Sequence, residues 1–477
     1  MLLAKLTTPK KIVFKGACRI AATILLTTAI TPVFAQDNSP YSRYGLGDIT
    51  PPTNVISRSM GGVSAGYNDH LSINYNNPAS YAWFQSYIEA KSKKMSTGRV
   101  VLDVGATIDN RTLREPNNNT INSKFGANNV TFSHIYMGMP INRNMGISFG
   151  LRPLTRVSYD MIKDGPLVDP VTNKLIDRAQ TLSQGNGGSY LPSIGTGYKI
   201  RLDSAQFLSL GVNVGYVLGK KDYSTRVVPY SDNDIYTPGN WQTLTTFGGF
   251  HFTGGAQYSF PINKKIRATI GAFGTLEQSL NARQNTTRET YYFSPEAGNV
   301  RIDSVYELNE VKGKIISPSN YTAGIFIQKA INYSTETPEG GWSLGVDFHR
   351  TNWADYRYYG QTDMVKDNWQ IRIGGELRPV PRAKSYFSNA AYRAGFFTGP
   401  DYINVGGKNL PQYGVSAGIG LPLLGQTQQA KNQLLMFNLG FEYIKRGNNS
   451  NIIKEDMFRV SLGLSLSDFW FGKRKYD

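Results

Sequence analysis

The sequence predicts an all-β fold, a transmembrane antiparallel β-barrel of about 14 strands with an N-terminal hatch, or plug, in its lumen. Three observations predict this fold. Many segments of about ten residues alternate apolar with small polar side chains, and the connections between them alternate between short and long. The composition is rich in Gly (49), Tyr (29) and Phe (23). Yet no run of about 18 apolar residues follows the leader, as a membrane-spanning helix would require.

The alternation is clearest between Phe458 and Leu466, where Phe, Val and Leu take every second position and Arg, Ser and Gly fill the others. In a strand, such alternation places the two sets on opposite faces. The polar face carries Gly, Ser and Asn rather than the Lys and Glu of a soluble sandwich, which favours a crowded barrel lumen. Strands are expected at residues 99–111, 129–140, 144–159, 190–200, 206–219, 245–260, 266–281, 316–332, 340–352, 366–379, 390–399, 411–422, 432–446 and 456–467.

The connections predict which end of the barrel faces outward, because outer-membrane barrels combine short periplasmic turns with long outer loops. Two of the short connections begin with Pro, which ends a ladder without interrupting its middle. An even number of strands places both ends of the barrel domain, residues 99–471, in the periplasm. Short connections are expected at residues 140–144, 201–205 and 261–265. Long outer loops are expected at residues 160–189, 220–244 and 282–315.

Residues 1–35 are predicted to be a secretory signal peptide. A basic leader precedes a short apolar run from Ile20 to Ile30, and cleavage is expected after Ala35. Cys18, the single cysteine, precedes the apolar run, whereas a lipidation cysteine would follow it. The mature chain is therefore expected to contain no disulfide. At the other end, residues 472–477 form a basic tail that we expect on the periplasmic side.

The charge balance indicates what the exported chain meets. The whole chain carries 51 Lys and Arg against 34 Asp and Glu, a net charge of +17, and because the leader holds five of these bases and no acid, the mature chain keeps about +12. An exported protein is not expected to meet nucleic acid. Outer-membrane lipid and lipopolysaccharide are therefore the expected partners of this positive charge in an integral outer-membrane protein.

Residues 36–98 do not show the barrel alternation and are expected to form the hatch. They contain the pair Gly61-Gly62 and the run Asn77-Pro78-Ala79. Pro cannot donate to a β ladder and pushes the preceding residue away from helix, so this run predicts a turn rather than a central strand. The segment is too long for a linker, and it can fill the lumen.

The stretch RSMGGVSAGYNDHLSINYNNPASYA (58–82) resembles the N-terminal hatch of the FadL family of outer-membrane transporters. The resemblance rests on the small-residue run, on the Asp that precedes Asn-Pro-Ala, and on the expected number of strands. It implies passive uptake of hydrophobic molecules such as long-chain fatty acids. In that family the ligand enters a pocket above the hatch and leaves sideways, through a wall gap beside a kinked third strand.

The third expected strand holds candidate parts of such a gap. Pro153 lies in its middle and is preceded by Gly146 and Gly150. An interior Pro removes a ladder hydrogen bond, and Gly in a strand often marks a bend. The alternative is an ordinary bulge, or a strand that leaves the membrane at Pro153. Arg152 and Arg156 are candidate ligands for a carboxylate head group, unless they pair with acids of the hatch or wall.

Two rival classes of function accompany the transporter. An enzyme is disfavoured, and neither a metal nor a cofactor is expected, because no histidine lies in a nucleophile motif or a metal-ligand spacing. The histidines are His70, His134, His251 and His349. The other rival is a non-transporting accessory barrel of an outer-membrane assembly or secretion complex, with other outer-membrane proteins as partners. Charges expected on the lumen side are Asp103, Asp347, Arg372, Glu376, Arg378, Glu442 and Arg459.

Overall fold

The computed structural model describes residues 39–88, 95–116, 124–169, 171–230, 237–332, 338–381, 385–423 and 433–470. The predicted signal peptide (1–35) and basic tail (472–477) lie outside the described residues. Among the helices of the described residues, none is long and apolar enough to cross a membrane.

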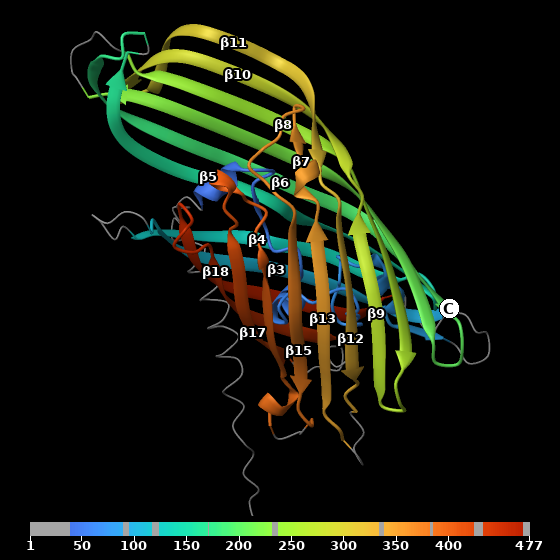
Figure 1. Cartoon of the computed structure of the whole chain (residues 1–477). Coiled ribbons are helices and arrows are strands. Elements are labelled where there is room, and N and C mark those ends of the chain that lie inside the picture. The colour runs from blue at the N-terminus through green and yellow to red at the C-terminus, as the bar shows by residue number, and fades with distance from the viewer. Residues whose placement is uncertain are drawn as a thin grey trace, which may run out of the picture. The chain divides into compact units, whose positions relative to one another are not determined.

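The strands form one antiparallel sheet that closes into a barrel of 14 crossings, which confirms the predicted fold (Figure 1). The sheet closes because β19 pairs with β3 from Lys454↔Arg114 to Trp470↔Gly98. Two crossings are interrupted, so that β9 continues as β10 and β11 continues as β12. The strands of the barrel are β3 (Met95–Arg114), β4 (Lys124–Pro140), β5 (Met145–Val168), β6 (Leu175–Arg201), β7 (Phe207–Pro229), β8 (Gly239–Pro261), β9 (Ile266–Thr275), β10 (Gln278–Ser294), β11 (Gly298–Ser317), β12 (Asn320–Lys329), β13 (Gly341–Thr351), β15 (Asn368–Arg378), β16 (Ala391–Pro400), β17 (Pro411–Leu423), β18 (Leu434–Arg446) and β19 (Lys454–Trp470).

Three segments that were expected to be outer loops are largely strands. Residues 160–189, 220–244 and 282–315 mostly continue the hairpins β5–β6, β7–β8 and β10–β11. In Figure 1 these strands extend well past the ends of β13 and β15. The loop prediction was wrong because polar residues occupy both faces of these extensions, so the sequence shows no alternation there.

The outer surface of the barrel carries an apolar belt to which nearly every crossing contributes. Such a belt is what a barrel presents to lipid. It is built from exposed side chains that alternate with lumen-facing ones along each strand. The belt includes Phe132, Phe149, Ile194, Leu210, Phe252, Ile270, Ile325, Val346, Ile373, Phe396, Val415, Phe441 and Leu464.

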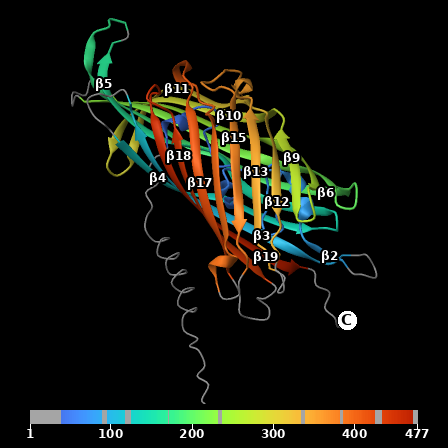
Figure 2. The same cartoon turned by 60° about the horizontal axis from the view of Figure 1, so that its bottom comes forward.

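Residues 39–88, here called the N-terminal segment, lie inside the ring of strands (blue in Figures 1 and 2). Most of the segment is buried. Its last strand pairs with the start of β3, with Ser86 opposite Gly98, and so leads the chain into the barrel wall. Its elements are η1 (Pro40–Arg43), β1 (Asp48–Ile49), α2 (Val55–Ser59), η2 (Pro78–Trp83) and β2 (Ser86–Ile88).

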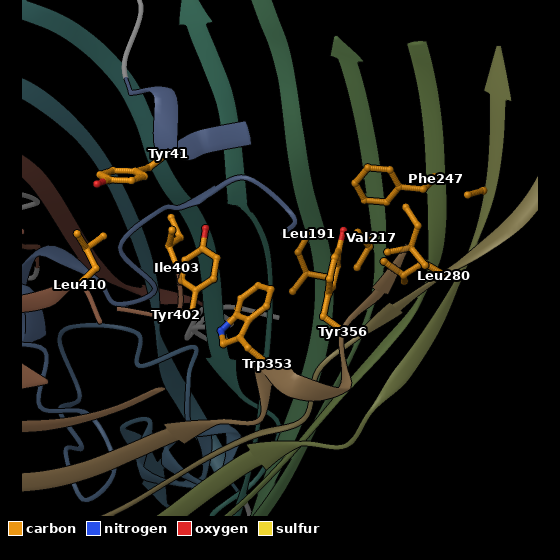
Figure 3. Close-up of a cluster of buried hydrophobic side chains, with 12 residues drawn as sticks. Tyr41, Leu191, Val217, Phe247, Leu280, Trp353, Tyr356, Tyr402, Ile403 and Leu410 are labelled. Carbon is orange, nitrogen blue, oxygen red and sulfur yellow. The ribbon is translucent and has the colours of Figure 1, made fainter. Parts of the chain in front are cut away.

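A cluster of buried aromatic and aliphatic side chains packs against the start of the N-terminal segment (Figure 3). Trp353 and Tyr402 come from two different connections between strands, and their rings stack with centroids 4.3 Å apart. The Tyr402 hydroxyl donates a hydrogen bond to the Gly47 carbonyl at 2.7 Å. The Tyr356 hydroxyl donates to the Gly45 carbonyl at 2.9 Å. The connections that follow β13 and β16 therefore fix residues 45–47 against the lumen.

Candidate functional site

The Asn77-Pro78-Ala79 run opens the short helix η2 inside the barrel. The Asn77 side chain is fully buried and accepts a hydrogen bond from the Ala79 N–H at 3.2 Å, so it caps the helix. Its amide nitrogen donates to the Ala65 carbonyl at 2.7 Å. Pro78 occupies the first helical position, where its missing N–H costs nothing. The predicted turn is thus a capped helix start that ties two parts of the N-terminal segment together.

Glycines of the wall make room for this run. A Cβ atom on Gly197, Gly211 or Gly255 would collide with Asn77, Pro78 or Ala79. The backbone of the N-terminal segment therefore approaches β6, β7 and β8 at distances that only glycine permits. The small residues on the lumen face of the strands predict crowding, but they do not reveal which segment causes it.

The pair Gly61-Gly62 has a similar role on the opposite side of the lumen. Gly61 has a φ of +67°, and a side chain there would meet the carbonyl oxygens of Phe396 and Ile373. The Gly61 N–H donates to the Ser416 hydroxyl at 2.9 Å. Both the left-handed backbone and the close approach explain why glycine occupies this position.

Buried acids of the wall also hold the N-terminal segment. The Asp347 carboxylate accepts hydrogen bonds from the N–H groups of Ser64 (2.7 Å) and Ala65 (2.9 Å). Asp103, likewise on the wall, accepts from the Ile73 N–H at 3.3 Å. These two acids were expected on the lumen side from the strand alternation, and the structure confirms it. Each binds backbone of the N-terminal segment rather than a free ligand.

An ion-pair network joins Asp48 of the N-terminal segment to the wall. Asp48 lies 2.6 Å from Arg111 Nη2 and 3.1 Å from Arg446 Nη1. Arg111 also pairs with Asp109 at 2.9 Å, and Arg446 pairs with Glu455 at 3.3 Å. All five side chains are buried. Sequence reasoning missed this network, because Asp48 lies in a segment without strand periodicity.

Two further sets of ion pairs attach the N-terminal segment to the wall. Arg58 of α2 lies 3.8 Å from Glu442 and donates to the Thr107 hydroxyl at 2.6 Å. Asp69 pairs with Arg378 at 3.3 Å, and Arg378 also pairs with Glu376 at 2.6 Å. The predicted lumen charges therefore serve mainly to attach the N-terminal segment.

The wall between β4 and β5 has a seam, defined here as the stretch of β5 beyond Leu151. The two strands pair only from Pro140↔Gly146 to Ile135↔Leu151. Beyond that point the free edge of β5 pairs with β1, with Asp48 opposite Arg156. Figure 1 shows β5 turning away from β4.

Pro153 lies at the start of the seam. The strand shifts register between Pro153 and Thr155 in its pairing with β6. The Thr50 hydroxyl donates to the Pro153 carbonyl at 2.8 Å, and the Thr50 N–H donates to the Leu154 carbonyl at 3.0 Å. The N-terminal segment therefore satisfies the first part of the β5 edge that β4 leaves free.

The other candidate residues of the opening lie elsewhere. Gly146 and Gly150 sit in the intact β4–β5 ladder. A side chain at Gly146 would collide with the Tyr81 carbonyl of the N-terminal segment, and one at Gly150 would collide with Tyr136. Close packing in the paired part of β4 and β5 therefore explains why glycine occupies both positions, and neither residue belongs to the seam.

A cavity of about 180 Å³, here called the lumen cavity, lies between the N-terminal segment and the wall. Leu46, Thr50 and Tyr75 line it from the N-terminal segment, and Arg152 lines it from β5. Arg156, the other candidate for carboxylate binding, is not among its lining residues. Of the two arginines that the sequence offers as candidates, only Arg152 therefore lines the cavity.

His251 and His349 both line the lumen cavity, whereas His134 does not. His349 is hydrogen bonded to the hydroxyls of Thr322 (2.8 Å) and Thr351 (3.1 Å) beside the lumen cavity. His134 lies 3.4 Å from Asp103 on the other side of the lumen. Among the described residues, no three His, Cys, Asp or Glu side chains are grouped so that they could hold a metal ion.

Comparison with known proteins gives one match to a family model and several to solved structures. The family model is described as BamG and matches residues 17–477. A search of curated proteins finds no match.

The solved structures that match include a channel and a transporter. A Pseudomonas aeruginosa FadL homologue is similar at 12% identity with a TM-score of 0.49, and the match covers 90% of this chain and 100% of that chain. The Pseudomonas putida toluene transporter TodX is similar at 12% identity with a TM-score of 0.49, covering 89% and 99%. The CymD monoaromatic hydrocarbon channel is similar at 12% identity with a TM-score of 0.45, covering 88% and 98%.

Proposed function

We propose that this chain, which belongs to the BamG family, is a structural subunit of an outer-membrane assembly or secretion complex and does not itself transport. Its place is the outer membrane, which it reaches by means of the predicted signal peptide (1–35). The apolar belt of the barrel supports this location.

One observation carries the proposal, namely that residues 48–50 pair with the β5 edge over residues 153–156, at the start of the seam. For an apolar solute to leave between β4 and β5, β1 must detach from the β5 edge. Asp48 must then leave Arg111 and Arg446. Breaking a buried ion pair by removing one partner costs about 3–5 kcal/mol. The contacts at the seam are those of a fixed part of the wall.

The chemistry of the lumen cavity supports the same conclusion. Sites for apolar ligands are lined mainly by apolar and aromatic side chains. The lumen cavity combines apolar and aromatic side chains, such as Leu46, Leu154 and Trp353, with two arginines, two histidines and many hydroxyl and amide groups. A long alkyl chain placed there would displace water from polar groups without replacing their hydrogen bonds, which disfavours its binding.

The β10–β11 hairpin offers a surface for a partner protein. Val305, Tyr306 and Leu308 lie on both faces of β11 and are exposed. Over residues 298–313, the edge of β11 that faces away from β10 pairs with no other strand among the described residues. Exposed apolar side chains and a free strand edge are features that a protein partner can cover.

The hairpin projects beyond the lipid rather than into it. Its exposed ion pairs include Arg301 with Glu307 at 3.5 Å and Arg283 with Glu310 at 3.6 Å. Charged side chains on lipid-facing positions are costly, so this surface belongs in water. We therefore expect the partner to be another outer-membrane protein with a part exposed above the membrane.

The test is purification of the tagged chain at its native level from membranes in mild detergent. The proposal expects other outer-membrane proteins to co-elute in a fixed ratio to the chain. Elution of the chain alone, with bound fatty acid or other lipid, would overturn it.

Passive uptake of hydrophobic molecules, including long-chain fatty acids, is the second candidate function. It is favoured by the end of the β4–β5 ladder beside the lumen cavity, at Pro153. If the chain transports, the substitution Pro153→Ala reduces uptake of a labelled fatty acid while the barrel still folds. If the chain is structural, uptake in cells that carry either form equals that in cells that lack the protein.

A further inference from the structure

The lumen cavity contains positive charge without an acid. Its lining includes Arg152, Arg372, His251 and His349, and no Asp or Glu is among the lining residues that the structure describes. Most other lumen arginines face a carboxylate. Arg58, Arg111, Arg378, Arg393, Arg446 and Arg459 each lie within ion-pair distance of one.

Arg152 makes no ion pair with the described residues. Its guanidinium instead lies over the ring of Tyr75, 5.5 Å from the centroid, and hydrogen bonds to the Tyr136 hydroxyl. A guanidinium has five N–H donors in a planar fork, and an aromatic face satisfies none of them as a carboxylate would. A half-buried guanidinium without a carboxylate partner can bind an anion.

Arg372 is in a similar state, although it is more deeply buried. Its Nε and Nη2 atoms donate to one neutral acceptor, the Gln370 side-chain oxygen, at 3.3 and 2.9 Å. The nearby Asp347 carboxylate is engaged by the N–H groups of Ser64 and Ala65. Two cations thus line one cavity, and neither forms an ion pair with a carboxylate of the described residues, although Arg372 also lines an adjoining cavity with Asp48, Asp401 and Glu442.

The remaining lining suits a hydroxylated molecule. Thr253 and Thr275 hydrogen bond to each other at 3.2 Å, and the Ser193 hydroxyl pairs with Tyr136 at 2.9 Å. Asn213 donates to the Tyr75 carbonyl at 3.0 Å, which leaves its side-chain oxygen as an acceptor. Hydroxyl groups both donate and accept, so such walls can satisfy the hydroxyls of a ligand.

We propose that the lumen cavity binds a small hydroxylated oxyanion, a polar molecule with a phosphate or carboxylate group held by Arg152 and Arg372. The volume of about 180 Å³ admits a small molecule and excludes a polymer. The oxyanion supplies the missing counterion, and the hydroxyls of the ligand pair with the Ser, Thr and Asn side chains of the wall. Because Tyr75 and Thr50 also line the cavity, the ligand bridges the N-terminal segment and the barrel.

Isothermal titration calorimetry on the purified full chain in nonionic detergent tests the proposal. The probes are glucose 6-phosphate, gluconate and laurate, which represent a hydroxylated phosphate, a hydroxylated carboxylate and an apolar carboxylate. We expect at least one of the two hydroxylated anions to bind and laurate not to bind at the same site. Binding of laurate alone, or of none of the three, would overturn the proposal.

Substitutions then assign the binding to the cavity. Arg152→Gln and, separately, Arg372→Gln should weaken binding about tenfold or more, which corresponds to the loss of one charge-assisted contact. Arg156→Gln is the matched control, because Arg156 lies on the same strand but outside the cavity lining, and binding should be unchanged. An equal loss in Arg156→Gln would show non-specific attraction and contradict the proposal. Thr351→Val, which keeps all charges, gives a second readout if an arginine variant fails to fold, and it should also weaken binding.

Discussion

Asp48 of the N-terminal segment accepts a hydrogen bond from Arg111 of β3, with 2.6 Å between Oδ2 and Nη2. This contact anchors β1 at the place where it pairs with the free edge of β5. The barrel wall and the N-terminal segment are therefore one connected structure at the seam. The predictions below test how firmly that connection is made.

Removing the charge of Asp48 should loosen the N-terminal segment. Asp48→Asn leaves Arg111 and Arg446 without one of their carboxylates, which destabilises the attachment by about 3 kcal/mol. Hydrogen exchange of residues 45–55 should accelerate by about a hundredfold, since every 1.4 kcal/mol is a factor of ten. Asp303→Asn, on the exposed part of β11, serves as the control and should change nothing. Equal exchange in wild type and Asp48→Asn would mean that the ion pairs do not hold the segment.

Two neighbouring glycines of β8 should respond differently to substitution by alanine. A Cβ at position 255 would collide with Asn77 and Pro78, whereas a Cβ at position 254 meets nothing within 4 Å. Gly255→Ala should lower the unfolding free energy by about 1–3 kcal/mol through overpacking. Urea unfolding followed by the mobility of the folded barrel on gels gives the measurement. The prediction fails if both variants unfold at the same urea concentration.

The attachment of β1 should survive mild acid. Burial raises the pKa of Asp48, but the charges of Arg111 and Arg446 outweigh burial and hold the pKa below its usual range. A carboxyl group with a lowered folded pKa stabilises above its unfolded pKa, about 3.9, and loses that contribution as the pH falls through the folded pKa. A fluorophore on Ile49→Cys should therefore report no change between about pH 8 and pH 5. A transition near neutral pH would contradict this assignment.

The projecting hairpin should matter for association and not for folding. Val305→Glu and Tyr306→Glu place charges on an exposed apolar surface and should reduce co-purification of partner proteins while the barrel keeps its stability. Val171→Glu is the matched control, because Val171 is also an exposed apolar residue but lies at the tip of the β5–β6 hairpin. If the hairpin variants retain all partners, another surface carries the association.

The sequence predicted the barrel well because each crossing has one lipid-facing and one lumen-facing side. Phe458 to Leu466 show this alternation, and the structure places that segment in β19. The outer hairpins could not be recognised in the same way, because strands in water have no apolar face. The expected strands 266–281 and 316–332 run through the breaks between β9 and β10 and between β11 and β12, which the sequence pattern does not signal.

The candidate site could be predicted only in part. Asn77-Pro78 and Gly61-Gly62 were recognisable because turns and close backbone approach require particular residue types. The partners of Asp48 could not be found, since they come from strands far away in sequence. Arg152 and Arg156 would share one side of a regular strand, but the register shift between Pro153 and Thr155 puts Thr155 and Val157 on the buried side beyond it. Only Arg152 therefore lines the lumen cavity, and the sequence does not reveal this shift.

A disulfide across the seam tests most directly whether the N-terminal segment must move. Ile49 and Thr155 are opposite each other in the β1–β5 pair, and Cys18 in the predicted leader is the only other cysteine. Opposite residues in an antiparallel pair lie at a separation that a disulfide can span. In cells that depend on Ile49→Cys/Thr155→Cys, the oxidised form should support the same outer-membrane protein content as the reduced form. Loss of that content on oxidation, with recovery after a reductant is added, would show that the segment must leave the seam and would contradict a structural role.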